Sequence, residues 1–480
     1  MNFRIFSIAL LAGSCLLNPA LYAQNNAAKL QTYFDTIYAQ KNLNGCILIA
    51  EEGKPVFSKA YGYADEQQNH LLNTETAFEL ASVSKMFTAM AIMQLQEKGK
   101  LNYEDSIKQY FPELDYPRVT IRNLLTHTSG VPEFLGFSAN DLAINKVNFN
   151  TDIIEKLASS KLKPIFKPGV ACSYSNTNYL LLATIVEKIS GQSFAAYMKK
   201  HVFLPVGMLH TEVYSRLTTP KKILNYASDE VWDAAINSYV KTDDLKSDMT
   251  NYLDGVNGPY GISSTINDLF KWDQVLYTEK LVSKETFKAA FTPTKLVGSD
   301  KFAEMMPGCP FGFGWMMSPG EVMGEEMFHT GGFGGYVNLM LRNTRLKRTI
   351  ILLTNYSNKA SVYQLMAGAV QLLDGKQPEI PVKAVIKKSI PIAAEKLKPL
   401  AGEYVVDQAP ALKMKIRADG NHLYARYHTQ AEVQIYPESE DSFFYTVVPA
   451  RIKFSLDKDG KTKKLVLFQN GAEIGMTQKL

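Results

Sequence analysis

The sequence is poor in cysteine, in net charge and in long apolar runs, and each shortage excludes a class of protein. Four cysteines in 480 residues are too few for a disulfide-stapled scaffold. A net charge of +5, from 52 basic and 47 acidic residues, gives no global attraction to nucleic acid. The length and the apolar share of 46% are typical of two or three globular domains.

Several motifs of known site types are also missing. No Gly-x-Ser-x-Gly occurs, which argues against an α/β-hydrolase. The 7 histidines are scattered and form no His-Glu-x-x-His, so we expect no metal site and no organic cofactor. The glycine-rich stretch at 331–335 is not followed by Gly-Lys-Ser/Thr, which argues against a phosphate-binding loop.

The one long apolar run lies at the N-terminus and predicts an export signal. Arg4 is its positive flank, residues 5–17 are its mostly apolar core, and Ala23 is a small residue at a cleavage point. We therefore expect a signal peptide over residues 1–23, a periplasmic or secreted protein, and no membrane span. Cys15 offers a less favoured alternative, a lipoprotein cut.

Periodicity and turn residues predict a mixed α/β (α+β) fold. Hairpins at 45–64 and 336–354 enclose helical segments at 85–98, 179–190 and 266–290, which indicates an antiparallel sheet flanked by helices.

The remainder of the chain changes in character. Residues 376–398 hold six lysines and three prolines and predict a linker. Short strands joined by glycine turns follow, which predicts a small antiparallel β domain. We expect the boundaries 1–23, 24–372, 373–399 and 400–480.

A serine and a lysine lie one helical turn apart at the start of an apolar helix. Ser-x-x-Lys occurs four times, at Ser82, Ser160, Ser238 and Ser455, but only Ser82 opens a long apolar helix. Helical side chains lean toward the N-terminus, so the amine of Lys85 leans back toward the Ser82 hydroxyl. If burial lowers its pKa, that amine is a base for the nucleophile. The alternative is a helix cap with a solvated lysine.

Two further elements carry chemistry of the same kind. Tyr174 and Asn176 leave a polar loop for a helix. A lysine ammonium would lower the pKa of the tyrosine and allow a phenolate proton shuttle, and the amide would hold a substrate carbonyl. His329, Thr330, Gly331 and Gly332 enter a strand, where glycines allow a ligand to approach the backbone. The alternatives are a packed loop tyrosine and a glycine-rich bend with an incidental histidine.

Together, Ser82-Val83-Ser84-Lys85, Tyr174-Ser175-Asn176 and His329-Thr330-Gly331 resemble the serine β-lactamase and penicillin-binding-protein superfamily. The Tyr-x-Asn form is similar to the class C β-lactamase branch, which also holds DD-carboxypeptidases, family VIII esterases and D-aminopeptidases. The segments at 120–130, 204–208, 261–265 and 311–315 also look like pieces of this family, so that the resemblance covers about residues 30–372.

The resemblance implies a fold, a reaction and a role for each residue. The fold would be an antiparallel sheet with helices on both faces and an all-helical lobe, followed by a lipocalin-type β-barrel. Ser82 would be acylated, Lys85 would take its proton and Tyr174 would be the second acid/base. Asn176 would hold the substrate carbonyl, and the N–H groups of Ser82 and Gly332 would form the oxyanion hole. The partner would be a small peptide, β-lactam or ester substrate.

One residue departs from the β-lactamase pattern. Efficient class C enzymes carry Lys-Thr-Gly, whereas His-Thr-Gly, found here at His329, occurs in peptidase relatives. The change exchanges a permanent cation for a group expected to titrate near pH 6.5, which disfavours strong β-lactam hydrolysis. An esterase, a D-aminopeptidase and a non-catalytic penicillin-recognising protein remain open alternatives. The sequence does not specify an oligomeric state.

Overall fold

The computed structural model describes residues 19–480 apart from 138–141, 246–248, 307, 319–324, 358, 383–387, 408, 428–431, 447–449, 457–461, 470–471 and 480. Its central element is a six-stranded sheet whose neighbouring strands are antiparallel. The order across this sheet is β12 (Met316–Met317), β13 (Glu326–Phe333), β14 (Tyr336–Asn343), β15 (Arg348–Thr354), β1 (Gly45–Glu51) and β2 (Lys54–Tyr61).

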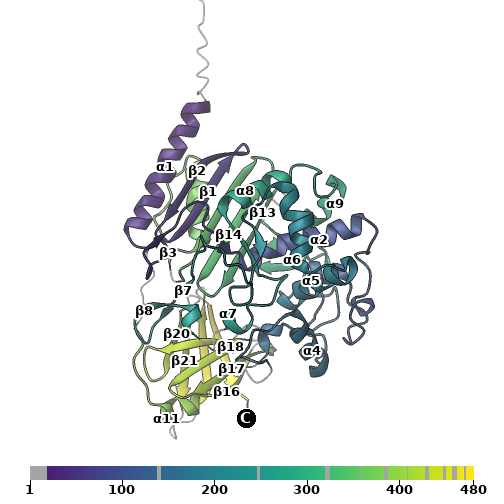
Figure 1. Cartoon of the computed structure of the whole chain (residues 1–480). Helices are drawn as coiled ribbons and strands as arrows, with labels where there is room; N and C mark the ends of the chain where they lie inside the picture. Colours follow the sequence, from purple (N-terminus) through teal and green to yellow (C-terminus); the bar gives the residue numbers. More distant parts are fainter. Residues whose placement is uncertain are drawn as a thin grey trace, which may run out of the picture.

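Helices cover both faces of this sheet (Figure 1). Side chains of Ile47 and Ile49 join a core with helices α1 (Pro19–Ala39) and α10 (Val362–Leu373). Side chains of Leu48 and Ala50 instead join a larger core with the helices of the other face. This alternation is the two-residue period of a strand buried on both sides, and it confirms the predicted fold class.

The larger core extends into a helical lobe. The helices of the lobe are α2 (Lys85–Glu97), α3 (Ile121–Leu125), α4 (Asn150–Ser160), α5 (Asn176–Ser190), α6 (Phe194–Met198) and α7 (Met249–Tyr252). Helix α8 (Ile266–Val275) packs against β1 and β15 of the sheet, and α9 (Lys284–Lys288) contacts α2. The prediction of one helical segment over 266–290 is wrong in part. The chain turns after Val275, and the Ser283 side chain accepts the N–H of Thr286 to cap α9 as a separate helix.

Short strands pair outside the central sheet. A three-stranded sheet holds β5 (Phe78–Glu79), β9 (Ile262–Ser264) and β6 (Glu212–Val213), and a separate hairpin holds β7 (Glu230–Asp233) and β8 (Ser238–Lys241). Two further pairs are β3 (Tyr63–Asp65) with β4 (His70–Leu71), and β10 (Glu304–Met306) with β11 (Cys309–Pro310).

The C-terminal part is a closed barrel, drawn in yellow-green in Figure 1. Its strands are β16 (Gly402–Val406), β17 (Ala409–Asp419), β18 (His422–Tyr427), β19 (Val433–Pro437), β20 (Ser442–Tyr445), β21 (Ala450–Leu456), β22 (Thr462–Gln469) and β23 (Ala472–Gln478). Large side chains such as Tyr404, Phe443 and Phe454 fill its core. Leu397 of the short helix α11 (Ala394–Leu397) belongs to the same core.

The barrel packs against the β7–β8 hairpin. Trp232 and Ala234 of the hairpin form one apolar cluster with Tyr436 and Phe444 of the barrel. The guanidinium of Arg426 on β18 also donates to the carbonyl of Gly136 in the helical lobe. The two parts are therefore joined by apolar and polar contacts as well as by the chain.

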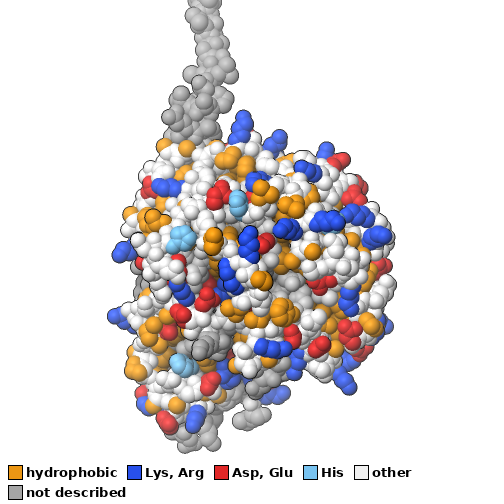
Figure 2. Space-filling view, viewed as in Figure 1, with side chains coloured by type: hydrophobic (Ala, Val, Ile, Leu, Met, Phe, Trp, Pro, Cys, Tyr) orange, Lys and Arg blue, Asp and Glu red, His pale blue; other side chains and the backbone are white. Residues whose placement is uncertain are grey.

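The surface and the N-terminal helix bear on the remaining sequence predictions. Basic and acidic side chains are interspersed on the face seen in Figure 2. Among the described residues no helix has both the length and the apolar character that a membrane span requires. Helix α1 runs across the predicted cleavage point after Ala23, whereas Cys15 and most of the predicted signal lie outside the described residues. Export therefore stays a prediction.

Candidate active site

Ser82 lies in a tight turn between β5 and α2. The turn is a 3-10 segment, Ala81–Ser84, which passes directly into α2 at Lys85. Ala81 has a φ of +51°, a left-handed conformation that non-glycine residues rarely adopt. The strained residue stands immediately before the serine that the sequence analysis selected, in a place where strain often accompanies function.

Lys85 is fully buried, with 0% of its surface exposed, and its amine has three neighbours. Nζ lies 3.0 Å from Ser82 Oγ, 2.7 Å from Asn176 Oδ1 and 2.9 Å from the Pro259 carbonyl oxygen. Burial holds the pKa of Lys85 well below its ordinary value, although nearby Glu133 opposes the shift. A neutral amine has two N–H donors and one lone pair. It can donate to the amide and carbonyl oxygens and accept the Ser82 proton.

Tyr174 approaches the same serine from the other side. Its hydroxyl donates to Ser82 Oγ at 2.7 Å, and its ring centroid is 4.7 Å from Lys85 Nζ. The prediction of a phenolate at Tyr174 is wrong for this state, because burial raises the pKa of its hydroxyl, outweighing the opposing hydrogen bond with Ser82. The side chain is therefore a neutral phenol in this state.

Asn176 is held by a residue that the sequence analysis missed. Glu133 is buried, and its carboxylate accepts the N–H of Asn176 at the start of α5 and the N–H of Leu135. Burial raises the pKa of Glu133 to about 7, against the lowering effect of these bonds. The sequence offered one signal for Glu133, which is its place just after the 120–130 segment that resembles the family.

His127 is the second missed residue. It is fully buried and has a φ of +55°. Its ring lies 4.4 Å from that of Tyr174, centroid to centroid, and Nδ1 accepts the N–H of Ser175 at 3.2 Å. The ring thus packs behind the tyrosine and holds the loop that carries it.

Strand β13 closes the site beside the serine. A Cβ added at Gly331 would lie 2.3 Å from the Leu80 carbonyl oxygen and 3.0 Å from Ser82 N, so only glycine allows this approach. Gly332 is exposed, and a Cβ added there would meet nothing within 4 Å. The strand therefore brings an open stretch of backbone next to the nucleophile.

His329 and Thr330 lie on the same strand, but within the described structure neither is hydrogen-bonded to Ser82, Lys85 or Tyr174. Thr330 Oγ1 is 3.3 Å from Tyr363 Oη. His329 is 2% exposed, its ring is 6.4 Å from that of Tyr174, and its Nδ1 lies 2.6 Å from the Thr330 carbonyl oxygen. The expectation that it titrates near pH 6.5 is wrong, because burial, with a smaller effect of nearby Lys85, lowers its pKa to about 3.

The cysteines stand apart from this chemistry. Cys46, Cys172 and Cys309 are free thiols. Cys172 is two residues from Tyr174, and burial raises the pKa of its thiol to about 12, which opposes nucleophilic use. Within the described residues no group of histidine, cysteine and carboxylate side chains is arranged to hold a metal ion.

Two family models match the chain. The model described as Beta-lactamase matches residues 30–374, and one described as a domain of unknown function, DUF3471, matches residues 387–478. Among curated proteins, Penicillin-binding protein 4* of Bacillus subtilis is 34% identical over 94% of this chain and 98% of its own length. The putative penicillin-binding protein PbpX of the same organism is 30% identical over 72% of this chain and 78% of its own.

Solved structures show the same fold at lower identity. The octameric penicillin-binding protein homologue from Pyrococcus abyssi has a TM-score of 0.62 at 24% identity, over 94% of this chain and 99% of its own. A D-amino acid amidase from Ochrobactrum anthropi has a TM-score of 0.60 at 20% identity, over 73% and 99% of the respective chains. At these identities the likeness concerns the fold.

Proposed function

The chain belongs to the beta-lactamase family and is a serine hydrolase, and on that premise we propose that it cleaves amide bonds of small D-amino-acid peptides through an acyl-enzyme on Ser82. The observation that carries the proposal is the position of one hydroxyl between a base and an acid. Ser82 Oγ lies 3.0 Å from Lys85 Nζ and 2.7 Å from Tyr174 Oη.

Acylation follows from these contacts. The lone pair of neutral Lys85 takes the Ser82 proton while Oγ bonds to the substrate carbonyl carbon. The N–H groups of Ser82 and Gly332 would receive the negative charge on the former carbonyl oxygen. The C–N bond then breaks. Tyr174 gives its proton to the leaving amine and regains one from the Lys85 ammonium. The net change is one proton moved from Ser82 to the amine.

Deacylation reverses the same proton path. A water molecule takes the place of the amine. As its oxygen bonds to the acyl carbon, it gives one proton to Tyr174, which passes its own proton to neutral Lys85. The ester bond breaks, Ser82 Oγ recovers a proton, and the acid leaves. Asn176 would orient the substrate carbonyl while its side-chain oxygen keeps Lys85 in place.

Neutral His329 bears on the choice of substrate. Its low pKa leaves the His-Thr-Gly strand without the cation that Lys-Thr-Gly would supply. This favours slow turnover of β-lactams and leaves esters and D-amino-acid amides as a second class of substrate. The fold likeness to a D-amino acid amidase and to the hydrolase EstCE1 is consistent with that second class.

Export and the boundaries of the parts belong to the proposal as well. We place a signal at 1–23, the hydrolase domain at 24–372, the linker at 373–399 and the barrel domain at 400–480. The family model that matches 30–374 supports an end of the hydrolase domain near 372, whereas the model that matches 387–478 begins within the proposed linker. Mass spectrometry of the exported protein would give the N-terminus directly.

Covalent labelling tests the proposal. A fluorescent penicillin or fluorophosphonate should label the wild type, and Ser82→Ala should abolish the label. Ser84→Ala is the matched control, because Ser84 is a buried neighbour whose hydroxyl has no partner. Label that persists in Ser82→Ala would refute the assignment. A panel of a D-Ala-D-Ala peptide, D-amino-acid amides, p-nitrophenyl esters and a chromogenic cephalosporin then identifies the substrate class. Labelling without turnover of any of them would indicate a penicillin-recognising protein.

A further inference from the structure

A second buried carboxylate lies three residues before the nucleophile. Glu79 ends strand β5, is 6% exposed, and has no role in the chemistry described above. Its Oε1 accepts two main-chain hydrogen bonds, from Ala81 N–H at 3.0 Å and from Gly261 N–H at 2.9 Å. One oxygen thus ties together two segments that are 180 residues apart in the chain.

Each of the two segments carries one part of the catalytic arrangement. Ala81 is the left-handed residue directly before Ser82, so the bond to its N–H fixes the turn that aims the hydroxyl. Gly261 lies two residues after Pro259, whose carbonyl oxygen accepts from Lys85 Nζ at 2.9 Å. The Glu79 carboxylate therefore sets the position of the serine relative to one of the acceptors that orient the lysine.

The backbone of Glu79 is fixed as well. Asn338 on β14 is fully buried, and its Nδ2 donates to the Glu79 carbonyl oxygen at 2.8 Å. The Asn338 Oδ1 in turn accepts the N–H of Thr354 on β15. Glu79 is thereby anchored to the central sheet, so the two loops that bond to its side chain are held in place relative to the sheet.

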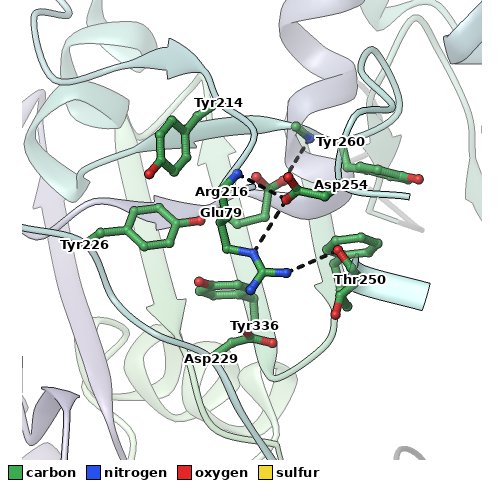
Figure 3. Close-up of a pocket in the computed structure, with 11 residues that line it drawn as sticks. Glu79, Tyr214, Arg216, Tyr226, Asp229, Thr250, Asp254, Tyr260 and Tyr336 are labelled. Carbon is green, nitrogen blue, oxygen red and sulfur yellow. Dashed lines mark hydrogen bonds and ion pairs between the residues drawn. The ribbon is translucent and has the colours of Figure 1, made fainter. Parts of the chain in front are cut away.

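A narrow pocket lies beside the Glu79 carboxyl group. Figure 3 shows Glu79 next to Arg216 and Asp254, with Tyr226, Tyr260 and Tyr336 around them. Burial raises the pKa of Glu79 to about 8, while the two N–H bonds and the Arg216 charge oppose the rise and Asp254 adds to it. Arg216 is itself held by Asp254, by Asp243 and by the Thr250 carbonyl. The pocket thus places a fixed positive charge near a carboxyl group that burial would otherwise destabilise when ionised.

We propose that Glu79 is a positioning residue for acylation, which holds Ser82 and the Pro259 carbonyl in register through one shared oxygen. This role rests on the proposed function, since it concerns the rate at which Ser82 is acylated. It requires an oxygen at the reach of a glutamate side chain, and it does not require that oxygen to be charged. Substitutions at Glu79 can change the length of the side chain and its ability to ionise separately.

The test compares three variants in the full chain by the rate and the final extent of labelling with a fluorophosphonate. Glu79→Gln keeps an acceptor oxygen at the same reach and should label within about threefold of the wild-type rate. Glu79→Asp keeps the carboxyl group but withdraws its oxygens by one methylene, and should label about 10-fold more slowly. Glu79→Ala removes the acceptor and should slow labelling about 100-fold, as expected for a misplaced nucleophile. The matched control is Glu230→Gln, at a carboxyl group on β7 that is 4% exposed and outside the site, and it should label at the wild-type rate.

The extent of labelling separates positioning from folding. A positioning role leaves every variant labelled to one equivalent, only more slowly, and with a good substrate it lowers kcat more than it raises KM. Glu79→Asp labelling as fast as Glu79→Gln, or a reduced extent with an unchanged rate, would overturn the inference. If Glu79→Ala fails to fold, the labelling rates of Glu79→Gln and Glu79→Asp still test the inference, since it requires the Gln variant to label faster. Label in Ser82→Ala would refute the proposed function itself, whatever the Glu79 series gives.

Discussion

Lys85 Nζ lies closer to Asn176 Oδ1, at 2.7 Å, than to Ser82 Oγ, at 3.0 Å. The amide oxygen can only accept, so this contact uses one N–H of the amine, and the Pro259 carbonyl uses another. With both protons of a neutral amine engaged, its lone pair is left for the serine. The asparagine thus orients the amine that we propose as the general base.

Asn176→Asp should shift the pH dependence of kcat/KM to higher pH. A carboxylate at the Asn176 Oδ1 position, 2.7 Å from Nζ, favours the ammonium form and raises the pKa of Lys85, as a close opposite charge does. The base then becomes neutral only at higher pH, and the acid limb of the profile moves with it. An acid limb that stays in place would show that Lys85 is not the group that limits the rate.

Glu133→Gln should move the same limb in the opposite direction. The Glu133 charge raises the pKa of Lys85, so its removal lets the amine lose its proton at lower pH. The variant also turns an amide NH2 toward the N–H of Asn176 or Leu135, both of which bond to the carboxylate. Loss of such a buried bond should cost about 1–3 kcal/mol of stability, measurable by denaturant unfolding.

The motif residues could be predicted from sequence because they lie close together in the chain or enter regular elements. Ser82 and Lys85 are one helical turn apart, and Asn176 opens α5. The contributions of Glu133, His127 and Glu79 could not be predicted, because each accepts a hydrogen bond from a backbone N–H of a distant segment. The lowered pKa of His329 could not be predicted either, since it depends on complete burial of the ring near Lys85. The hairpin at β14 and β15 was recognisable from its turn, whereas the break after α8 depends on the cap at Ser283.

His329→Asn should remove a pH-dependent part of the stability. The pKa of His329 is about 3 in the folded protein and near 6.5 as an ordinary histidine. The unfolded chain therefore binds a proton between these values that the folded chain does not. The contribution is complete above pH 6.5 and is lost as the pH falls toward 3. The stability of the wild type relative to the variant should fall by roughly 1.4 kcal/mol per pH unit within this window. Unfolding at pH 4 and pH 7 measures it, and an equal difference at both would contradict the neutral histidine.

Gly331→Ala should abolish acylation, while Gly332→Ala should leave the fold intact. The methyl group at 331 would come 2.3 Å from the Leu80 carbonyl oxygen, so β13 must move away from the Ser82 turn, whereas the methyl group at 332 meets nothing within 4 Å. Thermal unfolding and labelling of both variants check this. Equal labelling of Gly331→Ala and the wild type would show that the close approach is not needed.

Trp232→Ala should loosen the barrel from the rest of the molecule. Trp232 is 8% exposed and joins Ala234 in an apolar cluster with Tyr436 and Phe444 of the barrel. Its truncation removes a large side chain from a small cluster, and we expect a loss of roughly 3 kcal/mol, the low end for a core tryptophan. Because the cluster spans the two parts, calorimetry should show one unfolding transition dividing into two.

A double-mutant cycle with Tyr436→Ala gives the control for this last prediction. Residues in contact show a coupling of about 0.5–3 kcal/mol, and distant ones add independently. Trp232 also packs against Tyr239 of its own hairpin, with ring centroids 5.1 Å apart, so part of its effect stays within the hairpin. Additive losses in Trp232→Ala and Tyr436→Ala would mean that the cluster does not hold the barrel. The link would then depend on the polar contact of Arg426 with Gly136.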